Sequence, residues 1–513
     1  MTKTLFTPIR RWRYAILGAA VAILLYTTSL LAELEYTAIR AWRETPWIDR
    51  VGFAEFVEGY TAEAEAAGLV QHSIYEVPAR FGIGTKSNFS SDLFPTRVLG
   101  QSFNAIDLPK ELIRTQSGKG SATEMDGETF NPAILKMPRG IEPGWEYIVV
   151  ARGPRVDRQD IWAPEANRYA EEHGLVAFPA TLSRSGEFIP TLSAAPIFLP
   201  IATHSNNTSC GYWTFPFGPQ DPRLYFTDSG RPAMSFSMNA RKEGRCRSVG
   251  WVGDLRIVWA DLRGAMEGVD QALAAPWRKG DEEEFKVQEL VYDGMANMEK
   301  NWMGFFPGAE PNKSATLPMY HYSLVPGRTL HPSKQTTPET LQYTLSPAPG
   351  KSSCVADKLR PEVPNTGSIH HATPLYRLTL CGRRDPACLP NVRNTVLVGL
   401  GQVKVVHELG QRYGRFFVMW NTTEPYEYLS VGPLIRWFDT PDAEIVYAMS
   451  LVFTPPPPAN IFHSRADAAR EARYGPMHGF LDDELFVTLG VRDNEMGSVR
   501  MRAGEVVVGM QLC

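Results

Sequence analysis

The sequence has little cysteine and no excess of charge of either sign. Its 513 residues include 52 Lys and Arg against 56 Asp and Glu, which gives a net charge of -4. A nearly neutral chain gives no electrostatic reason to bind nucleic acid, so we expect no nucleic-acid partner. None of the six cysteines lies in a Cys-x-x-Cys pair, which argues against a zinc ribbon or a thioredoxin-like site.

Common catalytic signatures are also missing. The segment PGKSS (349–353) lacks the upstream glycine of a phosphate-binding loop, and HELGQ (407–411) lacks the second histidine of a metalloprotease helix. The sequence contains no Gly-x-Ser-x-Gly, and no Asp-x-Asp follows an apolar strand. These absences argue against the commonest hydrolases and against metal-dependent nucleotide-sugar transferases, so we predict no metal site and no cofactor.

Turn-forming and aromatic residues are abundant. Glycine and proline together supply 82 residues, and aromatic residues make up 11% of the chain. Short β-rich segments with turns between them, such as 145–153, 223–238 and 395–407, favour an all-β fold. Pairs of such segments recur about every 70–90 residues, which predicts a five-bladed β-propeller with helical insertions, one of them at 261–274. A two-sheet sandwich is the alternative.

One long apolar segment lies near the N-terminus. Residues 14–32 contain no charge and are long enough to span a bilayer, and Lys3, Arg10, Arg11 and Arg13 precede them. We predict a cytosolic tail (1–13), a transmembrane anchor (14–32), a short helical stem (33–75) and a lumenal catalytic domain (76–513). A cleaved signal peptide is the alternative.

The predicted lumenal location affects how the other residues are interpreted. Five Asn-x-Ser/Thr sequences follow the apolar segment, as expected of a single-pass type II protein of the secretory pathway. Because the lumen is oxidising, we predict a disulfide between Cys381 and Cys388, which lie at the ends of the short loop CGRRDPAC. Two buried thiols are the alternative.

Asp221 and Arg223 are the leading candidates for chemistry. They lie in FGPQDPRLYFTDSG (217–230), just before the clearest predicted hairpin. A carboxylate at the start of a propeller strand can act as a general acid or base, and a neighbouring guanidinium can bind phosphate. The alternative is a structural turn in which Asp221 caps the backbone and Arg223 pairs with it.

Three further segments carry weaker candidates. MEKNWMGFF (298–306) places Lys300 beside Trp302, a combination that can bind a sugar ring, although a buried Trp gives the same pattern. The loop NTGSIHHATPL (365–375) contains His371, and GPMHGFLDDELFVTLG (475–490) contains His478 and Asp483. Each of these residues has an ordinary structural alternative.

The order of these segments resembles the fungal β-1,2-mannosyltransferases and, more distantly, the mannoside phosphorylases with five-bladed propellers. The resemblance covers about residues 140–513. In those relatives the proton-transferring Asp lies in a Glu-Asp-Pro-Arg sequence. Asp221 and Arg223 match it, whereas Gln220 replaces the Glu.

The resemblance implies an inverting transferase of the Golgi membrane that moves mannose from GDP-mannose to a mannoside acceptor and forms a β-linkage. Asp221 would be the base, and the expected substrate-binding residues are Arg223, Lys300, Trp302, His371, His478 and Asp483. Of these, Arg223, Lys300 and His371 would neutralise the departing phosphate, Trp302 would stack on a sugar, and Asp483 would bind hydroxyls. A phosphorylase or hydrolase on the same propeller is one alternative, and a non-catalytic glycan-binding propeller, suggested by Gln220, is another.

Overall fold

The computed structural model describes residues 50–66, 97–99, 103–108, 113, 128–157, 171–191, 193–201, 218–241, 244–269, 276–277, 287–306, 317–337, 339–347, 353–359, 368–407, 410–437, 445–456 and 473–513. The predicted anchor at 14–32 lies outside these residues. Within the described ranges, no helix is both long and apolar enough to cross a membrane.

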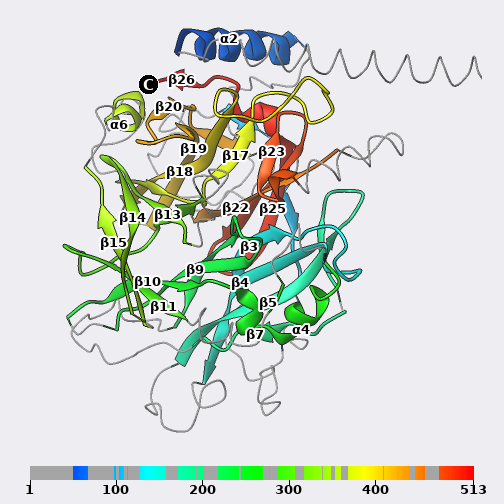
Figure 1. Ribbon diagram of the computed structural model, residues 1–513, viewed down its shortest axis with the longest axis vertical. Coiled ribbons are helices and arrows are strands. Elements are labelled where there is room, and N and C mark those ends of the chain that lie inside the picture. Colours follow the sequence, from blue (N-terminus) through cyan, green and yellow to red (C-terminus); the bar gives the residue numbers. More distant parts are fainter. Residues whose placement is uncertain are drawn as a thin grey trace, which may run out of the picture.

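Most described residues are in strands, so the predicted all-β class is confirmed (Figure 1). The first sheet is antiparallel and forms strand group 1, which contains β3 (Phe130–Lys136), β4 (Tyr147–Asp157), β5 (Glu171–Leu182), β6 (Phe188–Pro190) and β7 (Ile197–Phe198). The second sheet contains two antiparallel groups that a parallel β11–β15 contact joins. Group 2 contains β8 (Gln220–Phe226), β9 (Pro232–Asn239), β10 (Arg247–Val252) and β11 (Gln288–Tyr292). Group 3 contains β12 (Met303–Phe305), β13 (Met319–Leu324), β14 (Gly327–Thr336) and β15 (Thr340–Leu345).

The remaining strands form two further sheets. Group 4 contains β16 (Ser368–His371), β17 (Tyr376–Thr379), β18 (Thr395–His407), β19 (Gly410–Asn421), β20 (Tyr428–Val431) and β21 (Ile435–Trp437). Its sheet is extended by β1 (Arg97–Leu99), β23 (His478–Phe480) and β26 (Gln511–Leu512). Group 5 contains β2 (Phe103–Ala105), β22 (Val446–Thr454), β24 (Glu484–Val491) and β25 (Glu495–Arg502). The five-bladed arrangement itself stays a prediction.

Aromatic pairs connect successive strand groups through the hydrophobic cores between them. Ring centroids lie 5.1–6.4 Å apart in pairs that join groups 1 and 2, 2 and 3, 3 and 4, 4 and 5, and 5 and 1: Trp145–Trp259, Tyr225–Phe306, Phe305–Tyr426, Tyr376–Phe453 and Phe188–Phe486. Most of these rings are fully buried, and buried aromatic pairs contribute both apolar area and favourable edge-to-face geometry.

The predicted hairpin at 223–238 is confirmed. β8 and β9 pair antiparallel, and the turn between them is closed by a hydrogen bond from the Thr227 N–H to the Arg231 carbonyl at 2.9 Å. Gly230 in this turn has a φ of 76°, which glycine adopts without steric cost. All eight residues of β9 are buried, because packed layers cover both of its faces.

Few helices accompany the strands. The helices that lie whole within the described ranges are α2 (Arg50–Ala66), α4 (Ala260–Ala265), α6 (Cys354–Leu359) and the 3-10 turns η5 (Leu255–Ile257) and η6 (Ala503–Val506). The predicted helix at 261–274 is therefore confirmed only for its first turns, and residues 270–274 lie outside the described ranges.

Helix α2 covers part of the predicted stem and packs on the body of the protein. Phe53 and Val57 are buried in the core between groups 4 and 5, and the Gly509 N–H donates to Thr61 Oγ1 at 3.3 Å. Figure 1 shows α2 across one end of the molecule beside β26. This part of the predicted stem is therefore a helix that packs on the other described residues.

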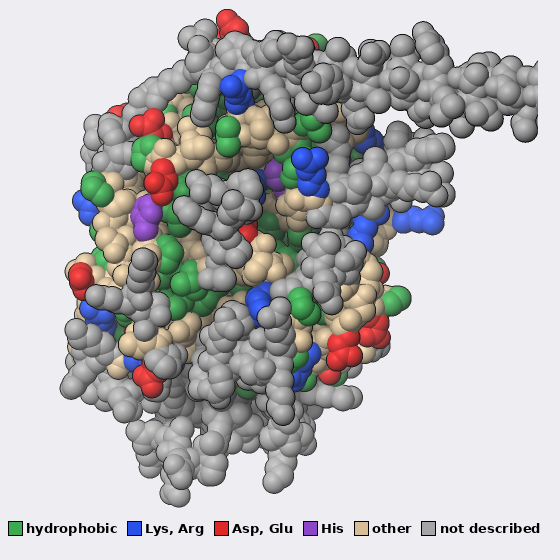
Figure 2. Space-filling view, viewed as in Figure 1, with side chains coloured by type: hydrophobic (Ala, Val, Ile, Leu, Met, Phe, Trp, Pro, Cys, Tyr) green, Lys and Arg blue, Asp and Glu red, His purple; other side chains and the backbone are tan. Residues whose placement is uncertain are grey.

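Two disulfides join described residues. The predicted Cys381–Cys388 bond is confirmed, and a second bond that the sequence did not reveal joins Cys354 of α6 to Cys513. On the face drawn in Figure 2, basic and acidic side chains of the described residues are interspersed, as expected from the small net charge.

Candidate functional site

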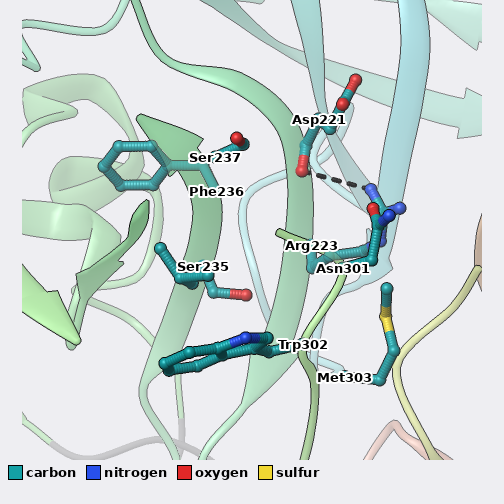
Figure 3. Close-up of a pocket in the computed structure, with 9 residues that line it drawn as sticks. Asp221, Arg223, Ser235, Phe236, Ser237, Asn301, Trp302 and Met303 are labelled. Atoms are coloured by element: carbon teal, nitrogen blue, oxygen red, sulfur yellow. Dashed lines mark hydrogen bonds between the residues drawn. The ribbon is translucent and has the colours of Figure 1, made fainter. Parts of the chain in front are cut away.

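A small, partly open pocket lies at the start of β8. Nine residues line it: Asp221, Arg223, Ser235, Phe236, Ser237, Val249, Asn301, Trp302 and Met303. β8 also contacts β3 and β22, so strands of groups 1, 2 and 5 meet beside the pocket. Figure 3 shows Asp221 and Arg223 on one side of the pocket and Trp302 at its border.

Asp221 has one bound and one free carboxylate oxygen. The Asn131 side chain donates from Nδ2 to Asp221 Oδ1 at 2.8 Å, whereas Oδ2 accepts no hydrogen bond from any described residue. Burial acts to raise the pKa of Asp221, but Arg152, Arg223, the Asn131 hydrogen bond and Lys300 outweigh it and hold the pKa below the ordinary 3.8. Asp221 is therefore ionised at neutral pH.

Arg223 is buried but only partly satisfied. Its Nη1 donates to the carbonyls of Asp221 and Pro222 at 3.1 and 3.0 Å, while Nε and Nη2 have no hydrogen-bond partner among the described residues. The guanidinium carbon lies 5.6 Å from the centre of the Tyr447 ring, which helps to fix its position. Two buried N–H groups of a cation that lack a hydrogen-bond partner are suited to bind an anionic oxygen.

Further charges surround Asp221. Arg152 of β4, Arg247 of β10 and exposed Lys300 are the basic neighbours, and Asp493 in the turn after β24 interacts with Asp221, Arg152 and Lys300. Burial lowers the pKa of Arg247 to about 10, and it remains a cation at neutral pH. The site therefore has more basic groups than acidic ones and can hold a ligand with more than one negative charge.

Trp302 lines the pocket, but its ring is only 2% exposed. Its indole N–H donates to Glu299 Oε2 at 3.0 Å, and the rings of Tyr292, Tyr320 and Tyr322 pack around it. The structural alternative, a buried Trp, therefore describes most of this ring. Lys300 and Asn301 lie between Glu299 and Trp302 in the sequence. Lys300 is exposed, and the Asn301 side chain accepts a hydrogen bond from the Tyr447 hydroxyl at 2.9 Å.

His371 belongs to a buried hydrogen-bonded chain. Trp420 Nε1 donates to His321 Nε2 at 3.0 Å, so His321 is protonated on Nδ1 and donates to His371 Nε2 at 2.8 Å. Burial, with a smaller effect of the neighbouring His321 and His370, holds the pKa of His371 well below its ordinary value. His371 is therefore neutral in the free protein, whereas the expected role of neutralising a departing phosphate requires a cation.

The neighbouring His370 lies nearer to the pocket. Its ring stacks 6.4 Å from that of Tyr447. Burial, together with Lys300, Lys404 and Arg223, lowers the pKa of His370 to about 3, so it too is neutral in the free protein.

Asp483 and His478 lie in a different cluster. Both oxygens of Asp483 bind Arg383, and the Phe480 N–H donates to Oδ2 at 2.9 Å. His478 Nε2 lies 2.7 Å from Thr379 Oγ1, and its ring stacks on Phe480. The structure thus brings together Asp221, Arg223, Lys300 and Trp302, and it gives His371, His478 and Asp483 other neighbours.

Sequence reasoning missed Asn131, Arg152 and Tyr447. Asn131 lies 90 residues before Asp221 and on another sheet, and no local pattern marks it. Gln220, which stands where the relatives carry Glu, is 8% exposed and pairs with Ser237 of β9.

Comparisons with known proteins give weak similarities. No protein-family model and no curated protein matches the sequence. Among solved structures, a β-1,2-mannobiose phosphorylase from Listeria innocua matches at 10% identity and a TM-score of 0.36, over 79% of this chain and 98% of that one. A GDP-Man-dependent mannosyltransferase from Leishmania mexicana matches at 9% identity and a TM-score of 0.35, over 78% and 90%. A candidate glycoside hydrolase from Bacteroides ovatus matches at 12% identity and a TM-score of 0.34, over 74% and 87%. Similarity at this level carries no argument for activity.

Proposed function

We propose that this protein is an inverting mannosyltransferase that uses GDP-mannose, with Asp221 as its base. The acceptor hydroxyl would give its proton to Asp221 as its oxygen attacks C1 of the mannose. The C1–O bond to the phosphate breaks, the electron pair leaves with GDP, and the configuration at C1 inverts. The acceptor would be a mannoside, as the sequence resemblance implies.

The protonation state of Asp221 carries this proposal. Its pKa is held below 3.8, and its Oδ2 is free, so the site offers a proton acceptor at neutral pH. A phosphorylase or hydrolase would instead need a protonated acid to assist the leaving sugar, which requires a raised pKa. The free site therefore favours base chemistry over acid chemistry.

Arg223 supports the choice of a phosphorylated donor. Its buried Nε and Nη2 have no hydrogen-bond partner among the described residues, and they can donate side by side to a phosphate. Lys300 and Arg152 would add positive charge as the GDP leaves, which is the main electrostatic demand when no metal takes part.

A glycoside phosphorylase is the second candidate. The same unpartnered nitrogens of Arg223 fit inorganic phosphate as well as a diphosphate. A bound phosphate dianion would also raise the pKa of Asp221 toward the range of a general acid.

The proposal includes the five-bladed propeller and the Golgi location. The ring is supported by the five aromatic pairs that connect each strand group to the next and group 5 to group 1. A single-pass type II anchor at 14–32 rests on the sequence alone. N-terminal sequencing of protein from carbonate-washed membranes tests the anchor, and a mature chain that starts near residue 33 would refute it.

A donor screen tests the activity. The full-length protein is incubated with a mannoside acceptor and either GDP-mannose or mannose 1-phosphate, with Asp221→Asn as the control, and products are identified by mass spectrometry and NMR. We expect GDP and a β-mannoside from GDP-mannose. A product only from mannose 1-phosphate would indicate a phosphorylase, and no product from either donor would indicate a non-catalytic protein.

A further inference from the structure

We propose that Asn131 is a positioning residue that holds one carboxylate oxygen of Asp221 and leaves the other free to accept the proton. We further infer that Gly490 is the residue that makes room for Asn131. The inference rests on the proposed role of Asp221 as a base.

The hydrogen bond joins two residues with unusual backbone conformations. Asn131 in β3 has a φ of 53° and Asp221 in β8 has a φ of 50°, both in the left-handed region. Asn and Asp tolerate this region better than other residues with side chains. Each residue lies at a shift in the register of its strand pair, so both side chains leave the regular pattern of their sheets. The side chains at these two irregular positions are in contact, with Asn131 Nδ2 lying 2.8 Å from Asp221 Oδ1.

The direction of this hydrogen bond is fixed by chemistry. Ionised Asp221 can only accept, so the Asn131 amide must present Nδ2 to it. The opposite atom, Asn131 Oδ1, is buried and has no partner among the described residues. Asn131 itself is 5% exposed, so it does not reach into solvent. Among the described residues, Asp221 is the one hydrogen-bond partner of the Asn131 side chain, which is what a positioning role requires.

Gly490 of β24 is where the Asn131 amide packs. A Cβ on Gly490 would lie 1.7 Å from Asn131 Oδ1 and 3.0 Å from the Asn131 backbone nitrogen. The first distance is far shorter than any nonbonded contact, so every other residue at 490 would push the Asn131 side chain away from Asp221. Three strand groups thus contribute to one carboxylate: Asn131 from group 1, Asp221 from group 2 and Gly490 from group 5.

The hydrogen bond has two chemical effects on Asp221. It stops the carboxylate from rotating, so that Oδ2 keeps one direction, and it favours the ionised form. Arg152 of β4, Arg223 of β8, Arg247 of β10 and Lys300 before β12 also act on this carboxylate, as does the negative charge of Asp493. These charges act on the protonation state of Asp221 from a distance. Among the described residues, Asn131 is the one whose hydrogen bond also fixes the orientation of the Asp221 carboxylate.

Asn131→Gly tests the role with least damage to the fold, because glycine adopts a φ of 53° without strain. Gly490→Ala tests it a second way, with the Asn131 side chain still present but displaced. Gly264→Ala in α4 is the matched control, since a Cβ there meets nothing within 4 Å. For both test variants we expect kcat to fall about 10–100-fold and KM for GDP-mannose to change less than about 2-fold. The acidic limb of the kcat/KM profile should also move to higher pH.

A residue with a merely structural role would lower the melting temperature and leave the pH profile unmoved. A normally folded Asn131→Gly protein with kcat within about 2-fold of wild type and an unmoved acidic limb would overturn the proposal.

A second measurement keeps the test independent of activity. If the wild type transfers no mannose, melting temperatures are compared between about pH 7 and pH 3 for the wild type, Asp221→Asn, Asn131→Gly and the double variant. At each pH, the melting temperature of a protein with Asp221 minus that of its Asp221→Asn counterpart measures how much ionised Asp221 stabilises the fold. Because Asn131→Gly raises the pKa of Asp221 in the folded state, this stabilisation should be lost at higher pH in proteins that carry Asn131→Gly. An identical pH dependence with and without Asn131→Gly would overturn the proposal.

Discussion

Asp483 and Arg383 form a buried ion pair in which each carboxylate oxygen lies 2.6 Å from a guanidinium nitrogen. Asp483 is fully buried, and the Arg383 guanidinium also lies 4.4 Å from the centre of the Phe480 ring. Both oxygens of this carboxylate therefore accept hydrogen bonds within the protein. The pair stabilises the contact between β23 and the Cys381–Cys388 loop.

Replacing Asp483 with Asn should destabilise the protein rather than change its substrate binding. Removing one partner of a buried ion pair leaves the other charge without compensation, which costs about 3–5 kcal/mol. We expect a large drop in melting temperature, and below the melting point we expect KM values close to wild type. A normal melt combined with a raised KM for the acceptor would instead support the sugar-binding role predicted from the sequence.

Replacing Asp221 with Asn should abolish transfer while the fold survives. Asn adopts a φ of 50°, and its carbonyl can still accept the hydrogen bond from Asn131, but it cannot accept a proton at neutral pH. We expect transfer to slow about 10²–10⁴-fold. Initial rates and a thermal melt of the same preparation provide the check, and transfer within a few-fold of wild type in a normally melting protein would exclude Asp221 as the base.

The pH profile should distinguish the free enzyme from the donor complex. Asp221 must be ionised to act as a base, and its lowered pKa predicts that the acidic limb of kcat/KM lies below the ordinary value of 3.8. The diphosphate of a bound donor would offset the positive charges of Arg223 and Lys300 and so raise the pKa of Asp221. The acidic limb of the kcat profile should therefore lie at higher pH than the acidic limb of the kcat/KM profile. Rates measured from about pH 3 to 8 test both statements, and a kcat/KM limb above about pH 5 would contradict the first.

Replacing Arg223 with Leu should separate stability from function. The buried Nε and Nη2 have no described partner, so their desolvation is not compensated in the free protein. We expect the Leu variant to melt at or above the wild-type temperature while donor binding weakens at least about tenfold. Arg223→Lys keeps the charge but not the paired N–H groups, and it should also bind the donor poorly. A strong loss of stability in both variants would show that Arg223 is mainly structural.

The sequence predicts features that depend on neighbouring residues. Two β-rich runs around a Gly-containing turn predict the β8–β9 hairpin, and a short loop that can fold back predicts the Cys381–Cys388 bond. The Cys354–Cys513 bond spans 159 residues and has no such local signal. Asn131 likewise meets Asp221 only after strands of two sheets come together.

Trp302 shows a second limit of sequence reasoning. An aromatic residue beside charged ones has the same sequence pattern whether its ring is open or covered. Here the cover comes from Tyr292, Tyr320 and Tyr322 on other strands, and the side chain of Glu299 holds the indole N–H. His371 is similar, because its pKa is lowered mainly by burial, which only the folded structure creates, with smaller effects of His321 and His370.

The left-handed backbone at Asn131 and Asp221 has a consequence for mutational tolerance. A selection that reports only on folding should accept Gly, Asn and Asp at 221 but only Gly and Asn at 131, because β-branched and bulky residues avoid this region. An Asp at 131 would place a second buried carboxylate against ionised Asp221. A selection for transfer should accept Asp alone at 221. Saturation libraries at these two positions, scored once for abundance and once for product, would therefore give different lists of accepted residues. The residues found in the first list but missing from the second would identify the chemical requirement separately from the conformational one.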